Sequence, residues 1–87
     1  MTAIEKACLE LLAKGPLPTG TIGSELWQQR DRHRMPQHYA RPADKLLRRL
    51  GRRGLVTWGE AYPRGPWVWK LTVRGVVAAR MGVEVPP

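Results

Sequence analysis

Four positively charged side chains recur through residues 41–53 at a spacing that places them on one side of an α-helix. They are Arg41, Lys45, Arg48 and Arg52. At about 100° of rotation per residue they form a single column, and the opposite side of the same helix is apolar. The apolar positions are Ala43, Leu46, Leu47 and Leu50. An arginine side chain can hold a phosphate through two hydrogen bonds or bridge O6 and N7 of guanine, so this column could bind a nucleic acid. A solvated basic face without a ligand has the same pattern.

The positive charge of the chain is concentrated around this segment. The 87 residues carry 15 Lys and Arg against 7 Asp and Glu, a net charge of +8 with a sequence pI of about 10.9. Residues 30–53 hold nine of these cations but only two acids, Asp31 and Asp44. Such a local surplus favours a binding surface for a polyanion over a general solubility device. Asp44 is expected off to one flank of the column, and Arg49 and Arg53 on a flank where they would contact phosphates.

Further cations lie outside this helix. The segment 30–40 has no helical period and contains Pro36, which predicts a loop. Its candidate phosphate-binding residues are Arg30, Arg32 and Arg34 with His33 and His38, and Gln37 and Tyr39 could add neutral hydrogen bonds. A solvated loop that contacts nothing explains these residues equally well. Arg64 lies between a proline and a glycine and is a candidate probe of the DNA minor groove.

The remaining polar residues do not support enzymatic chemistry. The sequence has no Ser/His/Asp set, glycine-rich phosphate loop or carboxylate pair, so we expect neither a catalytic site nor a cofactor. His33 and His38 lack a second pair of metal ligands, which argues against a zinc site. Cys8 is the only cysteine, so no internal disulfide is possible. With no apolar run near the ~18 residues of a membrane span and no signal-peptide pattern, we expect a cytoplasmic, nucleoid-associated protein without a membrane partner.

The apolar periodicity predicts one domain over residues 1–82 and a tail over 83–87. Four helices are expected, at about 2–14, 20–29, 42–53 and 73–81. The expected N-caps are Thr2, either Thr19 or Thr21, and Thr72. Pro42 is expected at the start of the third helix. The residues expected to face inward from the first two helices are Ile4, Ala7, Cys8, Leu11, Leu12, Ile22, Leu26 and, less clearly, Trp27.

The period changes at Leu55. Segments 55–58 and 67–71 are rich in β-branched and aromatic residues, and glycine and proline punctuate the residues between them. This is typical of a β-hairpin over residues 55–71. Trp58, Trp67 and Trp69 are expected mainly to pack in the core and within the hairpin. Because Trp67 and Trp69 share one strand face, exposure of that face would instead suggest a protein partner or a single-stranded nucleic acid.

Two segments carry a resemblance to a known family. The segment Leu46-Leu-Arg-Arg-Leu-Gly-Arg-Arg-Gly-Leu-Val56 resembles the exit of the recognition helix in winged helix-turn-helix proteins. The segment Trp69-Lys-Leu-Thr-Val-Arg-Gly75 is similar to the "Y-x-L-T-x-x-G" motif that closes the wing in MarR-like and PadR-like regulators. The resemblance implies an α+β, mainly α, winged-helix fold and a small bacterial or phage transcription regulator. It further implies that residues 42–53 enter the major groove of double-stranded DNA while the wing lies at the minor groove.

The chain departs from these regulators in its final helix, which is too short for a long dimerisation helix. A homodimer is therefore expected only by default, because one domain of this size reads few base pairs. The alternative function is a winged-helix module that binds a protein or RNA through its tryptophan-rich wing. Since a fold does not dictate a function, the surface chemistry has to distinguish the two.

Overall fold

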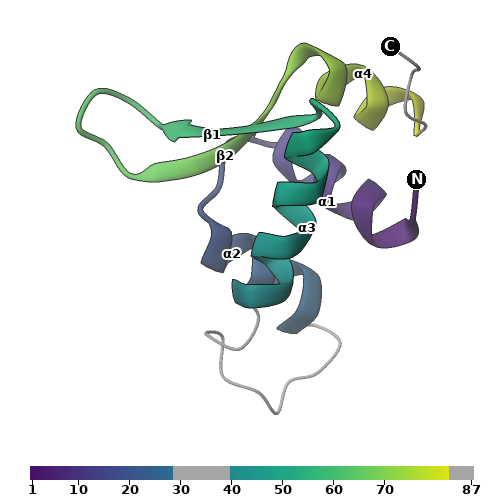
Figure 1. The fold of residues 1–87 in the computed structure, drawn as a ribbon, viewed down its shortest axis with the longest axis horizontal. Helices are drawn as coiled ribbons and strands as arrows, with labels where there is room; N and C mark the ends of the chain where they lie inside the picture. The colour runs from purple at the N-terminus through teal and green to yellow at the C-terminus, as the bar shows by residue number, and fades with distance from the viewer. Residues whose placement is uncertain (29–39, 83–87) are drawn as a thin grey trace.

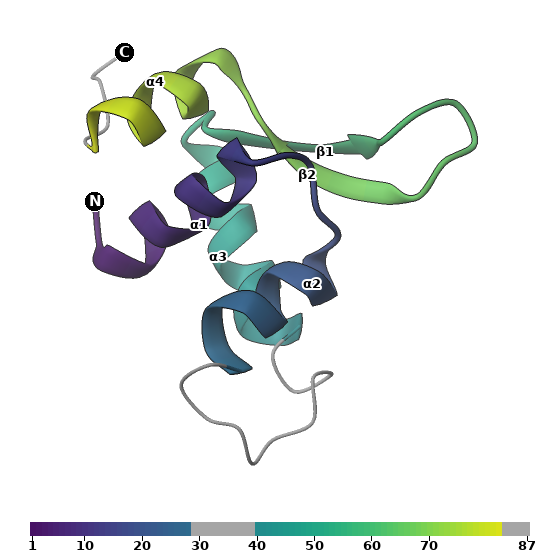
Figure 2. The same ribbon diagram turned by 180° about the vertical axis from the view of Figure 1, so that it is seen from behind.

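The computed structural model describes residues 1–28 and 40–82. Its elements follow the expected order of helices, hairpin and closing helix (Figure 1). They are α1 (Ala3–Ala13), α2 (Thr19–Gly23), the π-helix η1 (Ser24–Gln28), α3 (Ala40–Arg52), β1 (Val56–Glu60), β2 (Trp67–Leu71) and α4 (Val73–Met81). The hairpin extends to one side beyond the helices. Helix α3 is nearest the viewer in Figure 1 and α1 in Figure 2, so the two helices cover opposite sides of the molecule.

Helix α1 begins with the expected cap at Thr2. The Thr2 hydroxyl accepts a hydrogen bond from the Glu5 N–H, and the Glu5 carboxylate accepts one from the Thr2 N–H, which together form a capping box. The buried stripe of α1 runs through Glu5, Cys8, Leu9 and Leu12. Cys8 and Leu12 were expected in this stripe, but Leu9 was not. The charged Glu5 was not counted as a buried position, so the stripe predicted from the sequence was centred on a neighbouring side of the helix.

The second helical segment differs from its prediction in two ways. Its N-cap is Pro18, without a side-chain cap, so the prediction of Thr19 or Thr21 is wrong. The Thr19 hydroxyl instead accepts a hydrogen bond from the Trp69 indole N–H at 2.9 Å. The segment also changes to π-helix at Ser24, so it is not one regular α-helix. Ile22 is fully buried, as expected.

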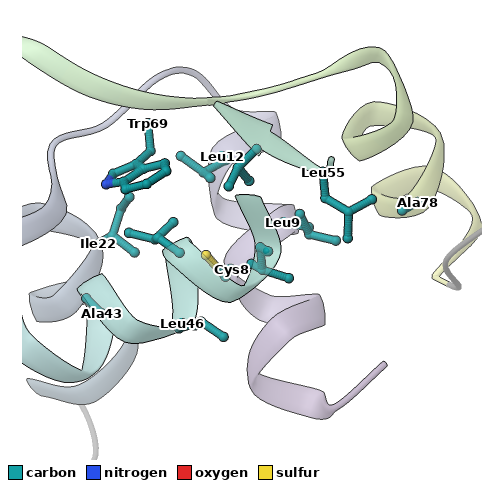
Figure 3. Close-up of a cluster of buried hydrophobic side chains, with 12 residues drawn as sticks. Cys8, Leu9, Leu12, Ile22, Ala43, Leu46, Leu55, Trp69 and Ala78 are labelled. Atoms are coloured by element: carbon teal, nitrogen blue, oxygen red, sulfur yellow. The ribbon is translucent and has the colours of Figure 1, made fainter. Parts of the chain in front are cut away.

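Helix α3 begins at Ala40, two residues before the expected start. Pro42 therefore occupies the third position, still within the first turn, where its missing N–H has no partner to lose. The apolar face is buried as predicted, with Ala43, Leu46, Leu47 and Leu50 each at most 3% exposed. Figure 3 shows this face meeting α1 and the base of the hairpin around Cys8, Leu12 and Trp69.

The two strands pair antiparallel, with Trp58 opposite Trp69 and Glu60 opposite Trp67. Leu17 adds a bridge to Trp69 through two backbone hydrogen bonds. The three wing tryptophans share one face, yet Trp69 is 8% exposed whereas Trp58 and Trp67 are 44% and 52% exposed. Trp69 packs in the core, as expected. Trp58 and Trp67 pack against each other within the wing, also as expected, but they stay about half exposed because the hairpin extends past the helices.

Helix α4 begins at the expected cap, Thr72, whose hydroxyl accepts from the Gly75 N–H at 3.1 Å. Gly75 packs directly on the backbone of Leu55: a Cβ atom there would lie 2.0 Å from the Leu55 carbonyl oxygen. Thr72 therefore caps α4, whereas Gly75 lets α4 approach the start of the wing closely.

Candidate nucleic-acid interface

The four cations of the column lie on the solvent side of α3, opposite its buried face. Arg41, Lys45, Arg48 and Arg52 are all exposed. The helix positions them because its apolar residues fix its rotation against α1 and α2. The column therefore presents four exposed positive charges on the side of α3 opposite its buried face.

Asp44 is closer to the column than the sequence predicted. Its Oδ2 atom lies 2.8 Å from Nε of Arg48, one helical turn away, so the column does have an acidic partner. Both side chains are exposed, 68% for Arg48 and 41% for Asp44. An exposed pair of this kind contributes little to stability, so Arg48 can exchange the carboxylate for a phosphate at small cost.

Arg49 and Arg53 turn to the other flank of α3, toward α1. The Nη1 atom of Arg53 donates to Oε2 of Glu5, and Nε of Arg49 lies 3.7 Å from the same oxygen. Burial by itself raises the pKa of the Glu5 carboxyl, but the Thr2 hydrogen bonds and the Arg53 charge together hold that pKa below its usual value. Arg53 is 29% exposed and Arg49 57%. The structure thus separates Arg53 from the exposed column and connects it to α1.

Arg64 lies at the tip of the wing, where it is exposed. It has a φ of 63°, and its N–H donates to a carboxylate oxygen of Glu60 at 3.3 Å. A left-handed backbone at a non-glycine residue costs about 1 kcal/mol. The tip is therefore a defined turn that presents the exposed Arg64 side chain at the end of the wing.

A cavity and the aromatic face of the wing lie beside the column, and the sequence did not assign either to the site. The cavity, of about 320 Å³, is lined by Thr19, Asp44, Arg48, Trp58 and Trp69. Arg48 thus shares one cavity with the aromatic face of the wing. The alternation of tryptophans at positions 67 and 69 predicts that these two rings share a face of the hairpin. Which rings on that face are exposed depends on the length of the wing.

The remaining predicted contacts lie outside the described residues. They are Arg30, Arg32, Arg34 and Tyr39, together with His33 and His38. Within residues 1–28 and 40–82, no group of His, Cys, Asp and Glu could hold a metal ion. Burial raises the pKa of the Cys8 thiol to about 12, so this cysteine is an unreactive core residue. No helix in the described part of the chain is long and apolar enough to cross a membrane.

Two solved structures of mutant forms of ZitR from Lactococcus lactis are similar to this chain. Their TM-scores are 0.71 and 0.70, at 22% and 23% sequence identity, and each comparison covers 94% of this chain. The chain corresponds to 50% of the length of each ZitR chain. This likeness confirms the fold as an α+β, mainly α, winged helix. A comparison with protein families and one with curated proteins find no match.

Proposed function

We propose that this winged helix binds double-stranded DNA and acts as a transcription regulator, with α3 in the major groove and the wing at the minor groove. The observation that carries the proposal is the exposed column on α3, directly opposite the face that anchors the helix in the core. A helix held in this way projects its cations as a rigid unit. The major groove of B-form DNA is wide enough to admit such a helix.

The positions along α3 suggest a division of labour. Arg41 and Lys45, near the start of the helix, are placed to reach base edges, whereas Arg52 near its end is placed for phosphates. Arg64 would add a contact at the minor groove, and Arg30, Arg32, Arg34 and Tyr39 would add phosphate contacts beside the major groove. Arg49 keeps over half of its side chain exposed and can contribute at the flank. Arg53, paired with Glu5, is the least suited of the predicted contacts.

Most of the affinity should be electrostatic. If about five phosphates are neutralised, the logarithm of the binding constant falls with the logarithm of salt concentration at a slope of about −4 to −5. Such a protein would act in the cytoplasm, at the nucleoid. A homodimer would double the length of DNA that is read, and the symmetry of the selected site would reveal it.

The test is fluorescence anisotropy of labelled random-sequence duplex DNA, titrated with the protein at two salt concentrations. The variant Arg48→Glu/Arg52→Glu reverses two charges of the column and should abolish binding at moderate salt. Its matched control is Lys14→Glu/Arg80→Glu, which reverses two exposed charges on α1 and α4. Both variants should remain folded by circular dichroism. Equal binding by the two variants would exclude α3 as the DNA-binding element.

A further inference from the structure

The wing carries a row of three aromatic rings, of which the fold buries only the inner one, Trp69. The ring of Trp58 lies between the other two, with centroid distances of 5.8 Å to Trp67 and 5.0 Å to Trp69. Trp58 and Trp67 are nearly parallel, at 24°. Trp69 is anchored by Thr19 and the core, whereas about half of each of the other two rings is exposed. By the strand register, the row therefore leads from the core out along the hairpin. The hairpin itself extends beyond the helices in Figures 1 and 2.

The inner end of this row adjoins a cation. Trp58 and Trp69 form the aromatic wall of the 320 Å³ cavity, and Arg48 and Asp44 line it from α3. Asp44 occupies only Nε of Arg48, and a guanidinium carries four further N–H groups. The Arg48 N–H groups that Asp44 does not use can therefore donate to an anionic ligand in the cavity. Thr19 is engaged with Trp69 at the back.

Aromatic rings beside an arginine have the chemistry of a site for unpaired nucleotides. Every base has a π-face that can stack on an indole ring, and its phosphate can bind the neighbouring guanidinium. In a duplex the base faces are stacked on each other and are not available. We propose that bases of single-stranded DNA stack on the exposed part of the Trp58–Trp67 pair, while Arg48 binds the phosphate next to them.

This site extends beyond the proposed duplex function and shares only Arg48 with it. The column on α3 needs paired DNA with an open major groove, whereas the aromatic row needs bases that have left the stack. A protein ligand would need no phosphate and no bases. The net charge of +8 and the arginine at the inner end of the row favour the nucleic acid.

The experiment compares two labelled probes of equal charge: a twelve-nucleotide oligothymidylate and an abasic strand of the same length. Both offer the same phosphates, but only the first can stack. We expect the oligothymidylate to bind at least about tenfold more tightly and to quench tryptophan fluorescence. Equal affinity for both probes, or no binding of either by the folded protein, would overturn the proposal and leave a protein partner as the ligand of the wing.

The variant Trp58→Ala/Trp67→Ala should reduce the preference for oligothymidylate to about the abasic level while duplex binding persists. Because removing two rings could weaken the hairpin, Trp58→Phe/Trp67→Phe is made in parallel and should retain most of the preference. An unchanged preference in the alanine variant would contradict the proposal. The variant Arg52→Glu tests the α3 function separately, since Arg52 does not line the cavity. It should lose duplex binding and keep the preference for oligothymidylate.

Discussion

Arg53, at the end of α3, forms an ion pair with Glu5 in the first turn of α1, although 48 positions separate them. Glu5 is 3% exposed and also completes the capping box with Thr2. One carboxylate therefore caps the start of α1, joins α1 to the end of α3 and holds Arg53 away from the exposed column. Two neighbouring arginines, Arg52 and Arg53, consequently have different tasks.

Arg52→Ala and Arg53→Ala should separate these tasks. Arg52→Ala should weaken duplex binding and reduce the salt slope by about 1, with unfolding free energy changed by less than about 0.5 kcal/mol. Arg53→Ala should leave the slope unchanged but cost about 2 kcal/mol, because it removes the nearest positive charge from a buried carboxylate. Anisotropy and urea denaturation of the same samples provide both readings. The reverse pattern would show that Arg53 is the DNA contact.

Acid should weaken the link between α1 and α3. Because the pKa of Glu5 is lowered in the folded state, its contribution is present above the ordinary value of 4.5 and is lost as the pH falls through the folded pKa. The unfolding free energies of the natural protein and Glu5→Gln, measured by urea denaturation from pH 7 to pH 2, should differ most at neutral pH. The difference should shrink below about pH 4.5. A difference in unfolding free energy that stayed constant from pH 7 to pH 2 would show that the Glu5 carboxylate is not the titrating group.

Gly75→Ala should destabilise the protein by about 3 kcal/mol, because the new methyl group would overlap the Leu55 carbonyl and separate α4 from the wing. Gly20→Ala is the matched control, since Gly20 lies in α2 with nothing within 4 Å of a Cβ atom. That control should gain about 0.5 kcal/mol from helix propensity. Thermal denaturation of both variants measures these two changes in stability. Similar melting temperatures would mean that α4 tolerates displacement from Leu55.

Thr19→Val should cost about 1 to 2 kcal/mol, because the Trp69 indole N–H loses its acceptor at a partly buried position. Thr19→Ser keeps the hydroxyl and should be much less affected. Urea denaturation followed by circular dichroism compares them. If the serine variant is destabilised as much as the valine variant, the methyl group rather than the hydrogen bond is important.

The sequence by itself determined the order of the elements and the two sides of α3. Ala43, Leu46, Leu47 and Leu50 are buried, and Arg41, Lys45, Arg48 and Arg52 are exposed, because helical periodicity is a local property. The caps at Thr2 and Thr72 were predictable for the same reason.

Only the tertiary structure decided which partners distant residues find. Nothing in the sequence paired Glu5 with Arg53, which only the packing of α3 brings beside it. Thr19 was expected to cap a helix, but the wing brings the Trp69 indole to its hydroxyl. Trp58 and Trp67 have the same strand chemistry as Trp69, yet they differ from it in burial because the hairpin extends past the helices. Periodicity shows which residues share a face. What covers that face depends on the lengths and packing of elements far away in the chain.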